Sequence, residues 1–351
     1  MQLRFIMREC SSGTGRQSLV NFSIIIRGAA VLVSLMLFSS LAFAETPNIS
    51  KEKTGAAKIS ERVSLELYGG YLKGQSKEYV YDPRTGYMES ELTWKIDEAL
   101  VVGGTLNVRP FDWLTLRLGG WTPCKSQNKM DDYDWQVSGQ GDWSDWSTHS
   151  NTKLNRAYMI DAGLEARVAS FGATPVFDRA SVSVLAGFRW FNVNWTAYGG
   201  SYIYSSNPGF RDVTGTDPDD DPGIDYEQWM ETPYLGIGGT MSKGRWLIKA
   251  EVTGSFWGRA RDKDNHFNRT LIFEEYYQNT AMLAGEVSLS YALTDDVDLF
   301  GRFAYIKYYE AQAPTSMTNY SNGTTSYASG NAAGMEHQSL LFNLGIIWRI
   351  F

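Results

Sequence analysis

The residues best suited to catalysis fall into two short polar loop segments. Asp132 and Asp134 form one group, and Asp262, Asp264 and His266 form the other. In an extended chain residues i, i+2 and i+4 point the same way, so the members of each group share a face. A histidine beside an orienting carboxylate can act as a general base, because its unperturbed pKa is about 6.5. A carboxylate pair facing it could hold a water molecule; acidic loops without a chemical role are the alternative.

The residues around His266 give less support to nucleophilic or metal-assisted catalysis. No serine or cysteine is paired with it in the sequence, so no covalent intermediate is expected. The Asp-x-Asp-x-His spacing could ligate a cation, but no additional histidine is placed to complete a zinc site. The pattern therefore favours hydrolysis by an activated water, with no metal and no resident cofactor.

The chain begins with a segment typical of an export leader. Residues 1–44 combine an arginine-containing n-region, an apolar stretch and an Ala-Phe-Ala cleavage site just before Glu45. We predict a signal peptide at residues 1–44, followed by a single domain at residues 45–351. An uncleaved membrane anchor is the alternative.

The composition of the predicted mature chain limits its partners. Without the leader, 28 Lys and Arg stand against 38 Asp and Glu, which argues against nucleic acid as a partner. Cys124 is then the remaining cysteine, so an intramolecular disulfide is excluded. We interpret Cys124 as a small apolar filler and not as a reactive thiol.

Apolar and polar residues alternate with period two along most of the chain, which predicts strands. Ten such runs begin near Val63, Met88, Trp113, Leu154, Ala180, Tyr226, Arg245, Tyr276, Val297 and Gln338. An even strand number and plentiful aromatic residues are typical of a transmembrane β-barrel, whose closure pairs every backbone group in lipid. We therefore predict an all-β fold, a ten-stranded antiparallel transmembrane β-barrel. A soluble β-sandwich is the alternative.

The connections between these runs alternate in length. The longer polar connections are residues 82–87, 125–153, 201–225, 259–275 and 311–336. If both termini face the periplasm, these are long extracellular loops, and the two acidic segments lie four strands apart, nearly opposite across the mouth. A sandwich would not need one set of loops uniformly short. The face of the last strand stays open, because Arg349 lies beside the apolar stripe Leu340, Phe342, Leu344, Ile346, Trp348 and Ile350.

Two further segments resemble the signature motifs of the omptins, the outer-membrane aspartyl-type endoproteases of Gram-negative bacteria. Residues 199–206, Gly-Gly-Ser-Tyr-Ile-Tyr-Ser-Ser, resemble the second omptin signature, with Ala186-Gly187 at the right distance upstream. Residues 143–152 resemble the first, with serines replacing two of its residues. The resemblance covers essentially the whole predicted mature chain.

The resemblance implies a catalytic set in this chain. By position, Asp132 and Asp134 match the catalytic acidic pair of the omptins, and Asp264 and His266 match the Asp–His dyad. It implies that His266 takes a proton from water, that Asp264 orients it, and that the acidic pair holds the water from the opposite wall. The expected location is the outer membrane, with this site on the extracellular side.

The resemblance also implies a substrate pocket. Glu78 and Asp262 match acidic residues that bind the basic side chain before the scissile bond, so cleavage after Arg or Lys is expected. Asp145 and His149 fall on further acidic and histidine positions near the cleft, and Asp145 is taken as substrate-binding. A solvated loop position is the alternative for His149 and the favoured interpretation of His337.

This chain departs from the omptin pattern where family members bind lipopolysaccharide. Trp190 and Asn192 replace an acid and an arginine, and Trp229 replaces a further arginine. Lipopolysaccharide and outer-membrane lipid are still expected partners, alongside polypeptide substrates with basic residues, but the dependence of activity on lipopolysaccharide should be weaker or differently placed.

Three other functions fit a barrel of this kind. A catalytically inactive adhesin or binding barrel of the same fold is the main alternative, and the retained Asp and His set argues against it. A porin is disfavoured because ten strands leave little room for an open channel. An acyl hydrolase acting on lipid would need a serine nucleophile near His266, and it gives no reason for two facing acidic groups.

Overall fold

The computed structural model describes residues 62–350, apart from residues 138 and 140. The predicted signal peptide, the predicted new N-terminus at Glu45 and the C-terminal Phe351 lie outside the described residues. The described residues belong to one compact unit. No helix in this part of the chain is long and apolar enough to cross a membrane.

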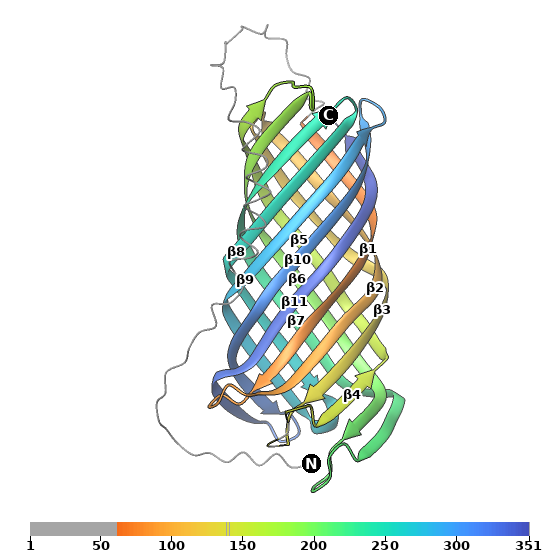
Figure 1. Ribbon diagram of the computed structural model, residues 1–351, viewed down its shortest axis with the longest axis vertical. Helices are drawn as coiled ribbons and strands as arrows, with labels where there is room; N and C mark the ends of the chain where they lie inside the picture. The colour runs from red at the N-terminus through yellow and green to blue at the C-terminus, as the bar shows by residue number, and fades with distance from the viewer. Residues whose placement is uncertain (1–61, 138, 140, 351) are drawn as a thin grey trace. The chain divides into compact units, whose positions relative to one another are not determined.

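The described part is built almost wholly from antiparallel strands (Figure 1). The strands are β1 (Val63–Tyr81), β2 (Met88–Phe111), β3 (Leu114–Asp134), β4 (Asp145–His149), β5 (Asn151–Phe171), β6 (Arg179–Tyr204), β7 (Val213–Lys243), β8 (Trp246–His266), β9 (Leu271–Ala292), β10 (Val297–Asn319) and β11 (Thr324–Arg349). A single 3-10 turn, η2 (Phe267–Arg269), joins β8 to β9 within the described residues.

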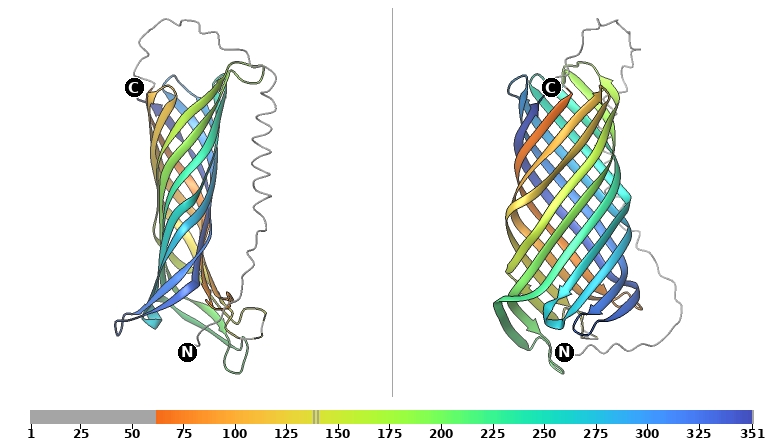
Figure 2. Two further views of the ribbon diagram at one scale, coloured as in Figure 1. Left: turned by 90° about the vertical axis from the view of Figure 1, so that its left-hand side faces the viewer. Right: turned by 180° about the vertical axis from the view of Figure 1, so that it is seen from behind.

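The strands close into a barrel, because β1 pairs with both β2 and β11. The other strands pair with their neighbours along the chain, except that β4 and β5 each pair with β3 and β6 and not with each other. The front and back views show the tilted wall of the barrel (Figures 1 and 2). Eleven strands occupy ten positions in the described ring, since β4 and β5 both lie between β3 and β6 and are separated only at Ser150. The predicted all-β barrel is therefore confirmed, with one of its ten predicted strands divided in two.

The long connections predicted as loops are mostly strand. A transmembrane β-strand needs about 9–11 residues, whereas β3 and β8 each have 21 residues and β7 has 31. Polar residues on both faces hid the period-two pattern in these extensions. Their backbone groups nevertheless pair across neighbouring strands, as in the register that places Asp134 opposite Asp145. The two acidic segments thus end strands and do not lie in loops.

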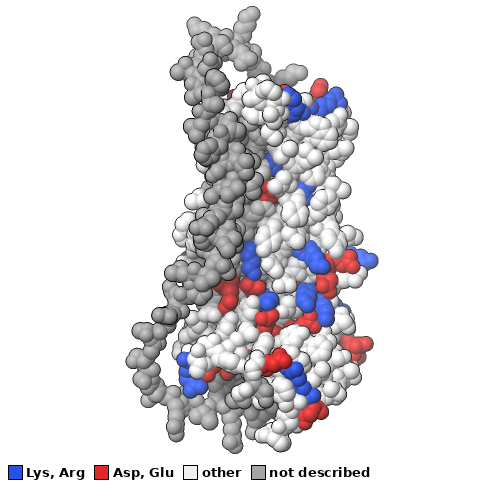
Figure 3. Space-filling model, viewed as in Figure 1, with Lys and Arg blue, Asp and Glu red and all other residues white. Residues whose placement is uncertain are grey.

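The outer surface carries the apolar band expected of a membrane barrel. The stripe of the last strand faces outward, with Leu344 60% exposed and Trp348 49% exposed, whereas the Arg349 side chain forms an ion pair with Asp298. This settles the face of that strand. In Figure 3, the charged side chains of the visible face gather over its lower part, at the end where β4 lies in Figure 1. Cys124, predicted as an apolar filler, is instead exposed on β3.

Large aromatic side chains fill the interior at mid-height. Trp94 from β2 is fully buried and stacks between Trp195 of β6, at 6.0 Å between ring centroids, and Tyr226 of β7, at 5.4 Å. Further from the acidic segments, a cavity of about 950 Å³ is lined by charged side chains such as Arg117, Glu251 and Arg302. The aromatic rings lie next to the acidic segments, since the Tyr226 hydroxyl donates a 2.8 Å hydrogen bond to Asp262.

Candidate active site

The catalytic residues predicted from spacing lie on the inner faces of strand ends. Asp132 and Asp134 end β3, and Asp264 and His266 end β8. Their period of two directs each group into the barrel mouth, as an extended chain requires. The two groups also influence each other electrostatically: the Asp264 charge adds to the rise in the pKa of Asp132, after burial and the charge of Asp134. The structure thus brings together the four residues assigned to catalysis.

The Asp264 and His266 side chains form a hydrogen-bonded pair. Nε2 of His266 contacts Oδ2 of Asp264, whose side chain is only 2% exposed. Arg269, which ends η2, contacts both nitrogens of the same ring, at 2.9 Å from Nε2 and still closer to Nδ1. Because a guanidinium only donates hydrogen bonds, it needs a ring lone pair. Nδ1 then accepts from Arg269 while Nε2–H donates to Asp264.

The Asp132 and Asp134 pair is set up to hold a proton. Burial raises the pKa of both carboxyls, that of Asp134 to about 6, and the charge of Asp134 raises the pKa of Asp132 further. The Ser90 hydroxyl donates a 3.3 Å hydrogen bond to Oδ1 of Asp132 and partly offsets this rise. Two carboxyls with raised pKa values can keep one proton near neutral pH, so the pair can act as a general acid.

Glu78 and Asp262 form a buried acidic cluster beside the dyad. Glu78 lies near the end of β1 and is 9% exposed, and Asp262 is 3% exposed. Burial raises the pKa of both groups, that of Asp262 to about 6, although hydrogen bonds to its carboxylate hold it down. The hydroxyls of Tyr226 and Tyr277 donate to Oδ2 of Asp262 at 2.8 and 3.1 Å.

The same two acids keep one oxygen each without a partner. Oε2 of Glu78 and Oδ1 of Asp262 accept no hydrogen bond from any described residue, and neither side chain has an ion-pair partner among residues 62–350 apart from the two not described. Buried acceptors without donors are costly. An entering cationic group with several N–H donors would satisfy both oxygens at once.

Asp145 and His149 are placed differently from the pocket acids. Oδ1 of Asp145 accepts the backbone N–H of Ser205 at 2.9 Å, and Oδ2 accepts the Ser144 hydroxyl at 2.6 Å. Oδ1 therefore ties β4 to the segment after β6, and Oδ2 holds the adjacent Ser144, which gives Asp145 an internal role. Its predicted contact with substrate stays a prediction. His149 is buried, with Nε2 3.0 Å from the Ser147 hydroxyl.

His337 is not the solvated loop histidine that was predicted. It lies on β11, is 1% exposed, and its Nδ1 is 2.8 Å from the Ser76 hydroxyl. Its ring centroid is 4.5 Å from that of Phe191. The prediction was wrong because the supposed loop at residues 311–336 is strand, which carries the following residues into the barrel interior.

Sequence reasoning missed two residues at the mouth, Arg269 and Glu275. Arg269 follows a turn, where no periodic pattern predicts side-chain direction. Glu275 lies on β9 directly opposite Asp262 in the register with β8, and only 6% of it is exposed. The adjacent Glu274–Glu275 pair gave no indication of which acid faces inward.

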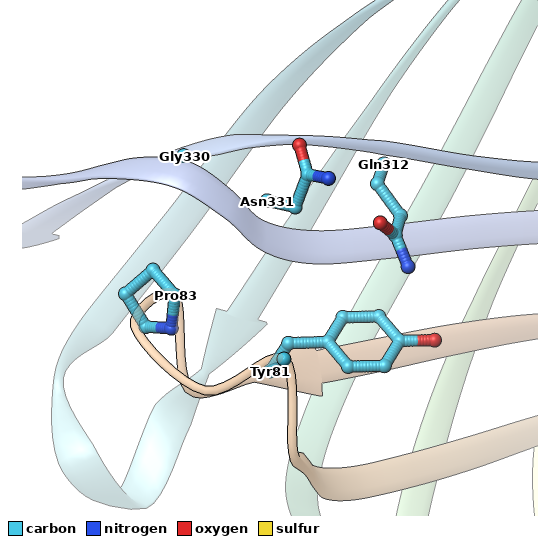
Figure 4. Close-up of a pocket in the computed structure, with 6 residues that line it drawn as sticks. Tyr81, Pro83, Gln312, Gly330 and Asn331 are labelled. Carbon is cyan, nitrogen blue, oxygen red and sulfur yellow. The ribbon is translucent and has the colours of Figure 1, made fainter. Parts of the chain in front are cut away.

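A cavity of about 420 Å³ beside Tyr81 and Gln312 is lined by none of the predicted site residues (Figure 4).

Known proteins resemble this chain in sequence and in fold. The model of the omptin family matches residues 59–350. The chain belongs to the omptin family. It is 31% identical to the plasminogen activator of Yersinia pestis, over 86% of this chain and 91% of that protein, and 29% identical to the outer membrane protease OmpP of Escherichia coli, over 90% and 98%. The crystal structure of the outer membrane protease OmpT from Escherichia coli covers 84% of this chain and 99% of its own, with 26% identity and a TM-score of 0.77.

This omptin is therefore a protease of the Gram-negative outer membrane. The three positions that depart from the omptin pattern lie on the membrane-facing wall. Trp190 is 40% exposed, and the Asn192 amide donates to Oε1 of Glu227 at 2.7 Å and to a backbone carbonyl. The Trp229 ring lies under the guanidinium of Arg261, 4.2 Å from it.

Proposed function

We propose that this omptin cleaves polypeptides after Arg or Lys by means of a water molecule activated at the barrel mouth. The observation that carries the proposal is the pair of unpartnered oxygens of Glu78 and Asp262 in a buried pocket two residues from Asp264. Two carboxylates in a desolvated pocket repel each other unless a cation lies between them. An Arg side chain supplies that cation and engages carboxylates with two parallel hydrogen bonds.

The dyad supplies the base in the proposed reaction. The His266 ring takes a proton from water as the resulting hydroxide adds to the scissile carbonyl carbon. Asp264, already bonded to Nε2, orients the ring and stabilises its charged form. The carboxylate of Asp264 is almost fully buried, so its attraction to the ring is weakly screened.

The facing acids supply the proton that the products need. The tetrahedral adduct collapses when its C–N bond breaks, and the leaving amine nitrogen must gain a proton. The Asp132 and Asp134 pair, with pKa values raised by burial, can deliver one and later recover it from His266 through solvent. No covalent bond to the protein forms in this scheme.

Lipopolysaccharide is proposed as a partner of this protein. Its effect on activity should be weaker than in omptins that carry arginine at the lipopolysaccharide-binding positions. None of Trp190, Asn192 and Trp229 offers a cation to a phosphate group, and the Asn192 amide is already used within the wall. Two cations near these positions are Arg261, stacked on Trp229, and Arg156, which is 3.4 Å from Oε1 of Glu227.

A matched peptide series tests the proposed specificity. The peptides differ only in the residue before the scissile bond, which is Arg, Lys, Gln or Leu. We expect cleavage after Arg and Lys to exceed cleavage after Gln by about 10³-fold, because a neutral side chain leaves the acids unpaired. The Glu78→Gln and Asp262→Asn variants should lose this preference while retaining slow cleavage. Cleavage mainly after Leu would contradict the pocket assignment.

A further inference from the structure

A third buried carboxyl lies beside the pocket acids. Glu275 on β9 lies directly opposite Asp262 in the register of the β8–β9 pair, so the two side chains share one face of the wall, with their Cβ atoms about 4.5–5.5 Å apart. The Thr315 hydroxyl of β10 donates to Oε1 of Glu275. Glu275 is 6% exposed, and nothing in the catalytic scheme above uses it.

Two carboxyl groups buried side by side repel each other when both are ionised, so one of them keeps a proton unless a cation lies between them. In agreement with this, burial raises the pKa of Glu275 and that of Asp262, and the charge of Asp262 raises the pKa of Glu275 further. The geometry therefore implies a proton held between the two side chains.

No described residue offers a positive charge that would replace this proton. The groups facing the pair are acids and hydroxyls from five strands: Glu78 from β1, Tyr226 from β7, Asp264 from β8, Tyr277 from β9 and Thr315 from β10. The charges of Asp262 and Asp264 raise the pKa of Glu275, and the Thr315 contact partly offsets them. The proton is thus the one counter-charge that the described pocket provides.

We propose that Glu275 is a further specificity-determining residue of this omptin, and that the empty pocket holds a proton between Glu275 and Asp262 which leaves when a basic side chain enters. The inference rests on the proposed cleavage after Arg or Lys. It makes substrate recognition an exchange of a proton for a guanidinium or ammonium group. The proton released passes to solvent, so charge and atoms balance.

The exchange predicts that affinity for basic side chains rises with pH. Below the pKa of the pair, the entering cation competes with a bound proton. Above it, the pocket is already ionised and affinity levels off. For a one-proton exchange, the apparent affinity changes by up to about tenfold per pH unit on the acidic side. This proton exchange should change the pH dependence of KM for an Arg peptide. The pH dependence of kcat should instead be set by the Asp264–His266 dyad and the facing Asp132 and Asp134.

The decisive measurement is proton release on binding of agmatine, which carries a guanidinium and no scissile bond. Calorimetric titrations of the folded protein in two buffers of different ionisation enthalpy report the number of protons released. The Glu275→Gln variant keeps a donor toward Asp262 but has no proton to release. The matched control is Glu274→Gln, the same change on the neighbouring residue of β9, whose side chain points to the opposite face.

We expect wild type and Glu274→Gln to release up to about one proton per agmatine near pH 6, and Glu275→Gln to release clearly less. The KM of Glu275→Gln for an Arg peptide should also vary less with pH, with folding checked by the heat-dependent gel shift typical of such barrels. Wild-type binding without proton release, or equal release by Glu275→Gln, would overturn the inference. The proposed function is tested by a different experiment: peptide profiling that shows no preference for Arg or Lys would contradict it, whatever the proton release.

Discussion

The Nη2 atom of Arg269 lies 2.9 Å from Nε2 of His266 and also contacts Nδ1 of the same ring. While this contact lasts, the ring lone pair is engaged by a donor and cannot take a proton from water. The Arg269 side chain is exposed, so solvent competes with the contact and weakens it. The charge of Arg269 also lowers the pKa of Asp132 and Asp134, which places it between the two catalytic groups.

Replacing Arg269 should therefore free the base. We expect kcat/KM of Arg269→Ala to rise by about 2- to 5-fold, since an exposed contact of this kind is worth about 0.5–1 kcal/mol. Steady-state kinetics on a single Arg peptide checks this, with Arg84→Ala, an exposed arginine in the connection between β1 and β2, as the matched control. A loss of activity of tenfold or more would show instead that Arg269 assists the reaction.

Removal of either residue of the Asp264–His266 dyad should abolish most of the catalytic activity. His266→Ala and Asp264→Ala should each lower kcat by about 10²–10⁴-fold, the usual cost of removing a general base or its orienting partner. Both residues lie at the end of β8, beyond the length of strand that the membrane needs, so the barrel should still fold. A folded His266→Ala protein with wild-type turnover would exclude His266 as the base.

The acidic pair predicts how kcat depends on pH. Burial raises the pKa of Asp134 to about 6 and that of Asp132 further, so the pair keeps a proton into the neutral range and loses it as pH rises. We expect kcat to fall on the alkaline side as this acid is lost. Asp132→Asn, which carries no transferable proton, should lower kcat and remove that alkaline limb. A pH profile unchanged in Asp132→Asn would contradict the assignment.

Asp145 should matter for stability more than for substrate binding. Asp145→Ala leaves the buried Ser205 N–H without its acceptor, at a cost of about 1–3 kcal/mol, whereas the Ser144 hydroxyl can still donate to the Asp134 carbonyl at 3.2 Å. The urea concentration at the unfolding midpoint should fall, while KM for an Arg peptide stays near the wild-type value. A large rise in KM at unchanged stability would support the substrate-binding role expected from the family.

Lipopolysaccharide should stimulate this protein only modestly. The wall positions that would bind phosphate carry no cation, and losing one charge-assisted hydrogen bond of about 1.5 kcal/mol weakens binding about tenfold. Refolded protein assayed with and without lipopolysaccharide checks this expectation. An absolute requirement that disappears on substituting Asn192 and Trp229 would show that the altered residues still form the site.

Period-two alternation and the spacing of Asp132, Asp134, Asp264 and His266 were enough to predict a barrel and the inner face of its mouth. The ends of the polar strand extensions could not be predicted, because the alternation of apolar and polar residues disappears where both faces of a strand carry polar side chains. Glu275 escaped prediction for a different reason. Its position opposite Asp262 depends on the number of residues in the η2 turn, since a shift of one residue would turn Glu274 inward instead. The contact between Arg269 and His266 depends on the same turn.

The stacked rings of Trp94, Trp195 and Tyr226 have a consequence for the cell envelope. A barrel open at its outer mouth is a potential leak for ions, nutrients and antibiotics. These three large rings are fully buried in the lumen next to the acidic residues of the mouth, so we expect them to obstruct the passage of hydrated solutes and to help keep the permeability barrier of the outer membrane. The protein in a planar bilayer should therefore pass no steady current.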